Sequence, residues 1–242
     1  MATPKFATVI RRAEVGEHAV VLEFTMQEPS YLDFQGGKYI IVHTGIEVGE
    51  GKTHKRPYSI FSNDSEQKRF ELAVKRIDGC LGSPHMHGLK PGDKLQFSGP
   101  WGTLWPDDDR PADSLVVATD NGITAAVSLV NSQLFRPRLS RSRLCWFVES
   151  DGYFLDRDFV SKRLPATLGS FEVVTCAPVG DHARVGRARQ WLAQSLTAGA
   201  PEQAFLVGDG DVVGALRGEL VAAGLPEDAV RIENFFNRPP KA

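Results

Sequence analysis

The spacing of apolar residues changes near residue 106, and no other feature of the sequence limits the fold as strongly. Before this point, apolar and polar residues alternate in short runs, as at residues 20–26 and 70–75. Such alternation buries one side of each strand, and turns that contain glycine or proline, as at residues 90–93, separate the runs. Residues 1–106 are therefore predicted to form a small antiparallel β-barrel.

Residues 112–242 show continuous apolar runs that alternate with helix-like segments. Continuous runs are typical of strands in a parallel sheet that is covered on both faces. The five runs are residues 115–118, 144–148, 171–174, 204–207 and 230–232. With right-handed crossovers they predict a doubly wound α/β domain with a five-stranded parallel sheet. The acidic segment between Pro106 and Pro111 is either a linker between the two domains or a surface loop.

Composition excludes several classes of protein. Hydrophobic residues (42%) and charged residues (24%) match a globular chain, and the net charge of −2 lacks the basic excess of most nucleic-acid-binding proteins. Cys80, Cys145 and Cys176 form no CxxC pair, which argues against a zinc or iron–sulfur site built from cysteines of this chain. His85 and His87 would diverge on a helix, so no metal site is expected. Neither a signal peptide nor a long apolar run is evident, so the cytoplasm is the expected location.

The first motif with chemical content is Arg56-Pro57-Tyr58-Ser59, at the start of a predicted strand. Arg56 offers a planar cationic fork that suits a phosphate, Tyr58 a flat ring, and Ser59 a small hydroxyl. Alternation along a strand puts Arg56 and Tyr58 on one side and Ser59 on the other. An ordinary strand with a surface arginine and tyrosine is the alternative interpretation.

The second motif is a segment at residues 79–87 that contains Gly82 and Ser83. Ser83 before Pro84 is a typical N-cap, followed by proline at the first helical position. The N-terminus of a helix offers free N–H groups and positive potential, which favour a phosphate. A capped short helix that binds nothing is the alternative.

With residues 98–102 added, the order RPYS, GLGS, KPGD and GPWG resembles the ferredoxin–NAD(P)⁺ reductase-like flavoprotein family, over nearly the whole chain. The resemblance implies a barrel that binds a flavin, with Arg56 on a flavin phosphate, Tyr58 on the isoalloxazine ring and Ser59 near its N5 atom. The separate GxxS-type turn favours FAD over FMN, and no iron–sulfur domain is expected. The residues assigned to FAD in this way are Arg56, Pro57, Tyr58, Ser59, Val74, Gly82 and Ser83.

The turn at residues 116–125 lies where a dinucleotide pyrophosphate would sit between a strand and a helix. The family usually has an AGGTGITP-like sequence there. This chain keeps Gly122 and Thr124 but has Thr119 and Asp120 where glycines are usual. We expect these side chains to crowd the turn, and Asp120 to repel a phosphate. Alternatively, Asp120 or Asn121 is a helix N-cap.

A second turn, at residues 205–211, departs from the family's CGP-like sequence. Val207 stands in place of the cysteine that approaches the nicotinamide, and Asp209 stands in place of the proline. Both departures fall at the proposed nicotinamide site, so flavin binding is predicted more firmly than NAD(P)H binding. The residues assigned to the nicotinamide nucleotide are Thr119, Asn121, Gly122, Thr124 and Gly208.

The end of the chain resembles the family's final E-x-F element, which approaches the flavin edge. The resemblance implies that Glu233 assists in proton handling, with Ser59 as the second catalytic residue, and that Phe235 or Phe236 covers the ring. A terminal strand with core phenylalanines is the alternative.

Two further stretches bear on specificity and partners. Glu149-Ser150-Asp151 places acidic residues where an arginine would bind a 2′-phosphate, which favours NADH. The run at residues 135–143 has four arginines and no acidic residue. It is either a solvated loop or a patch that docks an acidic electron-transfer partner or reaches the adenosine.

The expected function is that of an FAD-dependent oxidoreductase. Electrons would pass from NADH or NADPH, with NADH favoured, through FAD to a ferredoxin, a flavodoxin or an oxygenase component. One alternative is an FAD-binding electron-transfer subunit that no longer uses NAD(P)H, because its nicotinamide-site motifs are altered. A module that has lost both ligands is a third interpretation.

Overall fold

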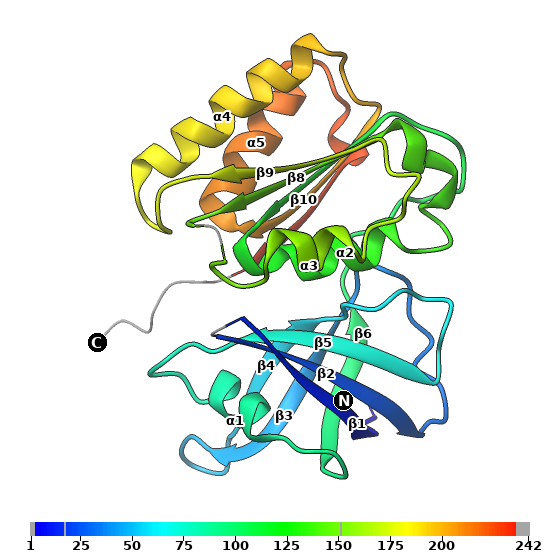
Figure 1. The fold of residues 1–242 in the computed structure, drawn as a ribbon, viewed down its shortest axis with the longest axis vertical. Helices are drawn as coiled ribbons and strands as arrows, with labels where there is room; N and C mark the ends of the chain where they lie inside the picture. Colours follow the sequence, from blue (N-terminus) through cyan, green and yellow to red (C-terminus); the bar gives the residue numbers. More distant parts are fainter. Residues whose placement is uncertain (1–2, 17, 151, 236–242) are drawn as a thin grey trace.

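In the computed structural model, the chain forms two sheets that lie one above the other (Figure 1). The structure describes residues 3–16, 18–150 and 152–235. The predicted fold class is confirmed, because a six-stranded antiparallel sheet is followed by a five-stranded parallel sheet with helices on both faces. The change in apolar spacing falls between the sheets, since β6 ends at Trp101 and β7 begins at Ser114.

The antiparallel sheet has the order β4-β3-β6-β1-β2-β5. Its elements are β1 (Lys5–Val15), β2 (Ala19–Glu28), β3 (Tyr39–Glu47), β4 (Thr53–Ser59), β5 (Arg69–Lys75), helix α1 (Gly82–Gly88) and β6 (Lys94–Trp101). Phe70 lies at the centre of the barrel core, with ring centroids 5.0 Å from Phe24 and 5.6 Å from Phe97. Strand β1 was not predicted, because its register shifts between Val9 and Arg11 and this irregularity interrupts the alternation.

The parallel sheet has the order β11-β10-β7-β8-β9. Its elements are β7 (Ser114–Thr119), η1 (Asp120–Gly122), α2 (Ile123–Val130), η2 (Arg136–Arg141), β8 (Ser142–Val148), α3 (Arg157–Ser161), β9 (Ser170–Thr175), α4 (His182–Thr197), β10 (Gln203–Asp209), α5 (Gly210–Ala222), η3 (Glu227–Ala229) and β11 (Val230–Phe235). Helices α4 and α5 cover one face, and α2 and α3 lie between the sheet and the barrel (Figure 1). Because the strand order reverses between β7 and β10, a crevice is expected beyond their carboxyl ends. No helix in the described ranges is long and apolar enough to cross a bilayer.

Helix α2 packs directly on the barrel. Ser128 Oγ donates a hydrogen bond of 2.7 Å to the carbonyl of Ser62. A Cβ at Gly36 would overlap the carbonyl oxygen of Ser128, so glycine permits this approach. The Asp64 carboxylate accepts from the amides of Gly36 (3.1 Å) and Gln133 (3.0 Å) and so bonds to both halves. These contacts set the position of one sheet relative to the other.

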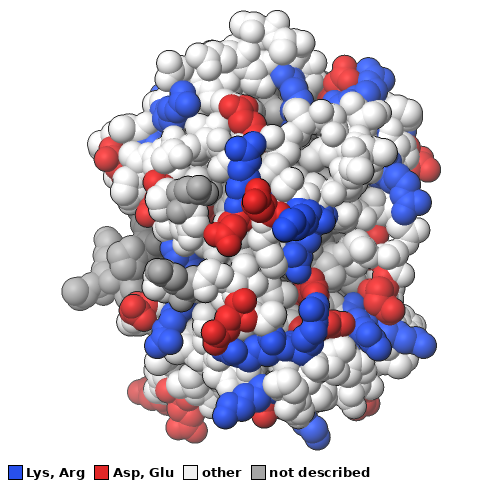
Figure 2. Space-filling model, viewed as in Figure 1, with Lys and Arg blue, Asp and Glu red and all other residues white. Residues whose placement is uncertain are grey.

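Three of the four arginines in the run at residues 135–143 have partners within the protein. Arg138 is fully buried, and its Nη2 donates to Asp108 Oδ1 at 2.8 Å. Arg141 pairs with Asp113 at 2.7 Å, and Arg143 donates to carbonyls at the end of α4. The acidic segment between the sheets thus binds Arg138, whereas Arg136 is exposed. Figure 2 also shows charges of both signs interspersed over the displayed face.

Candidate functional site

The side chains of Arg56 and Tyr58 converge on the start of α1. A Cβ at Gly82 would lie 2.8 Å from Arg56 Cγ and 3.0 Å from Tyr58 Oη, so glycine lets these side chains lie close against the start of α1, and we call this group the cradle. Arg56 is exposed, and its guanidinium has no hydrogen bond or ion pair with any other described residue. The motif lies at the end of β4, not at its start as predicted. Pro57 is exposed on β4 between Arg56 and Tyr58.

His54 belongs to this cradle and was missed from the sequence. A Cβ at Gly82 would lie 3.1 Å from His54 Cε1. Burial lowers the pKa of His54, and the neighbouring Arg56 and His85 lower it further. His54, Arg56 and Tyr58 are two residues apart in turn, so continuing the alternation by two residues would have found it. An unpaired guanidinium, imidazole nitrogens and a glycine at the start of α1 fit an anionic phosphate.

The N-cap prediction for Ser83 is wrong, and both Ser83 and Val74 make contacts within the protein. Leu81, not Ser83, is the N-cap of α1, and no side chain caps this helix. Ser83 Oγ instead accepts from the amide of Ile77 at 2.8 Å and lies 3.1 Å from Cys80 Sγ, so it holds the preceding loop in shape. Val74 is buried in the barrel core, and its carbonyl oxygen lies 3.0 Å from His87 Nε2.

The two residues predicted to be catalytic lie near Tyr39, which the sequence did not single out. Ser59 is opposite Tyr39 in the β3–β4 ladder. Glu233, on β11, reaches the same ring from the other sheet, because a Cβ at Gly102 would lie 2.9 Å from Glu233 Oε2 and 3.2 Å from Tyr39 Cδ1. Glu233 Oε2 is buried without a hydrogen-bond partner, and burial raises the pKa of this carboxyl to about 8. Glu233 therefore holds its proton at neutral pH.

The carboxyl ends of β7 and β10 meet at a buried ion cluster. Arg184, in the first turn of α4, pairs with Asp120 through Nη2 and with Asp209 through Nε at 3.0 Å. Asp120 is only 1% exposed, so its carboxylate is turned inward and does not crowd the turn as expected. It is also not an N-cap, because Thr119 holds that position before η1. Burial raises the pKa of Asp120 to about 6, against the opposing effect of Arg184.

The predicted nucleotide residues come together at this edge, but most of them bind one another. Thr119 Oγ1 accepts from the amide of Asp209 at 2.7 Å, and a Cβ at Gly208 would overlap that oxygen. Thr124 Oγ1 donates to the carbonyl of Asn121 at 2.8 Å. A Cβ at Gly122 would lie 2.5 Å from the carbonyl oxygen of Val207. These residues therefore hold the turns after β7 and β10 against each other, and few of their polar side-chain atoms lack a partner.

Unpartnered buried oxygens mark the same region. Among the described residues, Asp120 Oδ1, Asn121 Oδ1 and Glu233 Oε2 are buried side-chain atoms without a hydrogen-bond partner. A buried polar atom without a partner is costly, so its presence at an edge calls for a ligand or ordered water. The observation supports a binding site at the carboxyl ends of β7, β10 and β11.

A contact between the two sheets lies close to Asp120. Lys75, at the end of β5, places its Nζ 2.9 Å from the ring centroid of Tyr153, which follows β8. Burial lowers the pKa of Lys75, while Glu149 and Asp120 raise it. Glu149 Oε1 accepts from the amide of Val179 at 3.3 Å. Asp151, which with Glu149 predicted the NADH preference, lies outside the described residues.

The aromatic end of β11 is described only in part. Phe235 packs against the apolar cluster of the second sheet, which fits the core interpretation of this residue. Phe236 lies outside the described residues. Within the described ranges, no three His, Cys, Asp or Glu side chains are grouped to hold a metal ion.

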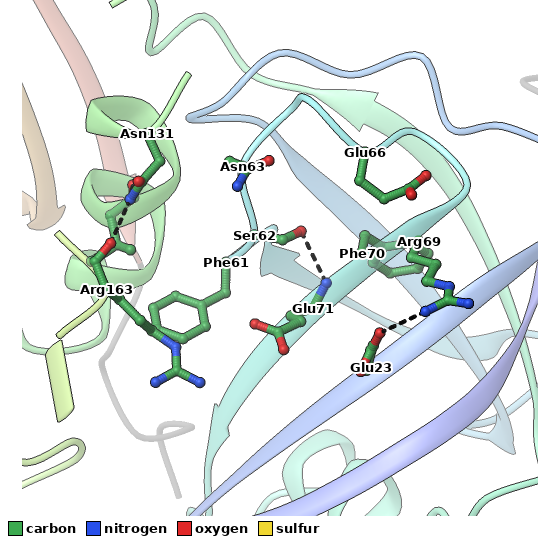
Figure 3. Close-up of a pocket in the computed structure, with 11 residues that line it drawn as sticks. Glu23, Phe61, Ser62, Asn63, Glu66, Arg69, Phe70, Glu71, Asn131 and Arg163 are labelled. Carbon is green, nitrogen blue, oxygen red and sulfur yellow. Dashed lines mark hydrogen bonds and ion pairs between the residues drawn. The ribbon is translucent and has the colours of Figure 1, made fainter. Parts of the chain in front are cut away.

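A separate groove of about 360 Å³ lies between β5 and α2 (Figure 3). None of the residues assigned to FAD or nucleotide lines it. Its carboxylates Glu23 and Glu71 pair with Arg11 at 2.9 Å, and Arg163 stacks 3.7 Å from the ring centroid of Phe159. The groove is therefore a polar seam between the sheets, distinct from the cradle at Gly82.

Comparison with known proteins agrees with this geometry. Residues 6–105 match the family model described as the oxidoreductase FAD-binding domain. The chain is 36% identical over 113 residues to the ferredoxin–NADP reductase B of Sorangium cellulosum, which covers 47% of this chain and 45% of that protein. It is 27% identical over 135 residues to the reductase subunit of an aromatic O-demethylase of Amycolatopsis sp., which covers 54% and 38%. The matched segment thus spans less than half of each of these relatives.

The fold is shared over nearly the full chain with a solved structure. The flavohem-like FAD/NAD-binding domain of a nitric oxide dioxygenase from Vibrio cholerae O1 biovar El Tor superposes with a TM-score of 0.72 at 16% identity. The match covers 96% of this chain and 98% of that one. At this identity the likeness concerns the arrangement of the two sheets.

Proposed function

We propose that this chain is a member of the ferredoxin–NAD(P)⁺ reductase-like flavoproteins, and that it is an FAD-dependent oxidoreductase that takes electrons from NAD(P)H and passes them to a separate redox protein. The observation that carries the proposal is the cradle at Gly82. There, an exposed guanidinium without a partner among the described residues and a half-buried tyrosine lie against the start of α1, within a segment that matches an FAD-binding family.

In this proposal residues 1–106 bind FAD. Arg56 and His54 hold a phosphate group, the backbone at Gly82 approaches it closely, and Tyr58 supports the flavin ring. When bound, FAD accepts a hydride equivalent from the nicotinamide and releases the two electrons one at a time. Burial raises the pKa of Tyr58, so its hydroxyl remains neutral and can donate a hydrogen bond.

Glu233 and Ser59 are proposed as the catalytic side chains. Glu233 keeps its proton at neutral pH and lies beside Tyr39, and Ser59 offers a hydroxyl on the neighbouring strand. A protonated carboxyl can donate a hydrogen bond or a proton at the edge of the flavin without placing a negative charge there. Phe235 remains a candidate for covering the ring.

Residues 112–242 are proposed to bind the nicotinamide nucleotide at the carboxyl ends of β7 and β10. Asn121, with an unpartnered oxygen, is the side chain best placed to contact it, at the turn that Gly122 and Thr124 help to shape. Glu149, at the end of β8, and Asp151 favour NADH, because a carboxylate suits the ribose hydroxyls better than a 2′-phosphate does.

The acceptor is proposed to be a ferredoxin, a flavodoxin or an oxygenase component. The Amycolatopsis relative is named as the reductase subunit of an O-demethylase, which supports the last class. We place the protein in the cytoplasm, because Cys80, Cys145 and Cys176 are all free thiols and fit a reducing compartment.

A second candidate function is an FAD-binding electron-transfer subunit that does not use NAD(P)H. The observation that favours it is the pair of carboxylates, Asp120 and Asp209, beneath the expected pyrophosphate position. Together with Arg184 they give this spot a formal charge of −1, which opposes a dianionic pyrophosphate.

Anaerobic reduction of the FAD-loaded protein separates the two functions. Mixing with NADH or NADPH should bleach the flavin absorbance band, faster with NADH, and a redox partner protein should restore it. A band that persists with both nucleotides but bleaches with dithionite would exclude the proposed electron donor and support the second candidate.

A further inference from the structure

We propose that Arg184 is a positioning residue for the nicotinamide nucleotide, which it never touches. It holds the turn after β7, where the backbone of Asp120 is left-handed, and it offsets the charge of one of the two carboxylates beneath the pyrophosphate position. This inference rests on the proposed use of NAD(P)H. It concerns Asp120 and Asp209, the two acidic residues at which the sequence departs from the family's usual motifs. The guanidinium of Arg184 forms ion pairs with both.

One buried guanidinium joins three segments that are distant in sequence. Arg184 pairs with Asp120 after β7 and with Asp209 at the end of β10, and its Nη1 donates to the carbonyl of Ala177 after β9 at 2.8 Å. The side chains of Arg184 and Asp120 are 2% and 1% exposed. The planar fork of arginine can bind several oxygens in fixed directions, whereas lysine offers a single point charge. The geometry of the turn therefore depends on the fork.

The backbone of Asp120 needs this support. Its φ is +48°, in the left-handed region that glycine adopts most easily. A buried carboxylate in that position is costly unless it is paired. Arg184 binds the carboxylate, and Trp146 Nε1 donates to the carbonyl of Asp120 at 2.9 Å. Two buried donors thus hold the side chain and the backbone carbonyl of Asp120.

The inward direction of these charges leaves the turn open to a ligand. Asp209 Oδ1 accepts from the amide of Asp211 at 3.0 Å and caps α5, while its other oxygen faces Arg184. Asn121, the next residue along the turn, is only half-buried and keeps an unpartnered oxygen. Removing the charge of Arg184 would leave two carboxylates beneath the pyrophosphate in place of a formal charge of −1. Arg184 therefore determines both the shape of the turn after β7 and the charge beneath the pyrophosphate position.

The test measures binding of oxidised nucleotide, so no turnover is involved. FAD-loaded wild type, Arg184→Lys and the triple variant Asp120→Gly/Arg184→Met/Asp209→Asn are titrated with NAD⁺ and NADP⁺ by calorimetry. Arg184→Lys should raise the Kd about 10-fold or more, or about 1.4 kcal/mol, with FAD content unchanged. The triple variant should bind within about 3-fold of wild type, since glycine accepts the left-handed backbone and no buried charge remains.

The control is Arg189→Lys, which changes an exposed arginine of the same helix that pairs with Glu219 at 3.2 Å. It should leave the Kd unchanged. An Arg184→Lys variant that binds as tightly as wild type would overturn the positioning role of Arg184 but not the proposed function. A folded triple variant that has lost binding would do the same. If Arg184→Lys does not fold, the triple variant decides.

The failure of the proposed function has a different outcome. A wild type that binds neither nucleotide overturns both the electron donor and the positioning role. If the triple variant then binds where wild type does not, the ion cluster excludes the dinucleotide instead of positioning its turn.

Discussion

Two arginines stand at the two proposed ligand sites, and they differ in every respect that matters for binding. Arg56 is exposed on β4 and has no ion-pair partner among the described residues, so its charge is available to a phosphate. Arg184 is buried and lies against Asp120, Asp209 and the carbonyl of Ala177, so its charge acts within the protein. Charge alone does not indicate a ligand contact, because the partners of the group decide where that charge acts.

The glycines of the two sites differ in the same way. Gly82 lies against the side chains of Arg56, Tyr58 and His54, and the Arg56 guanidinium has no hydrogen bond or ion pair among the described residues. Gly208 and Gly122 leave space for Thr119 and the carbonyl of Val207, and protein atoms fill it. The barrel site is therefore a cradle, whereas the turn of the second site is a packed scaffold with one half-buried polar side chain, Asn121.

The largest effect is expected where the second site is packed. Gly208→Ala should destabilise the fold by about 3 kcal/mol, because the new Cβ would overlap Thr119 Oγ1 and the φ of +127° disfavours a side chain. Gly210→Ala is the matched control, since its nearest atoms are 3.9 Å away. Urea unfolding measures both. Equal stability of the two variants would show that this turn is less tightly packed than described.

The next effect tests the open site. Arg56→Ala should weaken FAD binding about 10- to 100-fold, the range for loss of a charge-assisted hydrogen bond, with little change in stability because its guanidinium makes no hydrogen bond or ion pair with another described residue. Arg11→Ala, which removes an exposed pair with Glu23 and Glu71, is the control and should retain FAD. Fluorescence titration of the apo-protein gives both dissociation constants. Unchanged affinity in Arg56→Ala would refute its phosphate contact.

The smallest effect concerns the carboxyl that lies between the sites. The pKa of Glu233 is raised from 4.5 to about 8, so the folded protein keeps a proton that the unfolded chain releases. The stability that this proton gives is complete below pH 4.5 and is lost as the pH rises through about 8. Glu233→Gln removes this dependence.

Relative to Glu233→Gln, wild type should therefore lose about 1 kcal/mol or more between about pH 5 and about pH 8. Urea unfolding of both proteins at the two pH values measures the difference. Glu219→Gln, at an exposed position on α5, should show no such trend. A difference that does not change with pH would place the Glu233 carboxylate in contact with solvent.

The sequence predicted most of the fold, because spacing of apolar residues is a local signal. Each of the five strands of the parallel sheet overlaps a predicted apolar run. Strand β1 was missed where its register shift broke the alternation. The group at β4 could also be predicted, since alternation along one strand puts Arg56 and Tyr58 on the same face. The same alternation would have added His54.

The second site was less readable because its decisive partner is distant in sequence. Arg184 lies 64 residues from Asp120, in a polar helix whose pattern gives no sign of a buried charge. When Arg184 is not taken into account, the sequence predicts that Asp120 and Asp209 repel a phosphate. Ser83 was misread for a related reason, since its hydroxyl bonds to Ile77 behind it and does not cap the helix.

The central claim is that the barrel offers a ready FAD site that does not depend on the second site. Titration of flavin-free protein with FAD, in wild type and in the Asp120→Gly/Arg184→Met/Asp209→Asn variant, tests it most directly. Both proteins should bind one FAD per chain with the same affinity, and FMN should bind more weakly. A folded wild type that binds no FAD, or a variant whose FAD affinity falls with the ion cluster, would contradict the account.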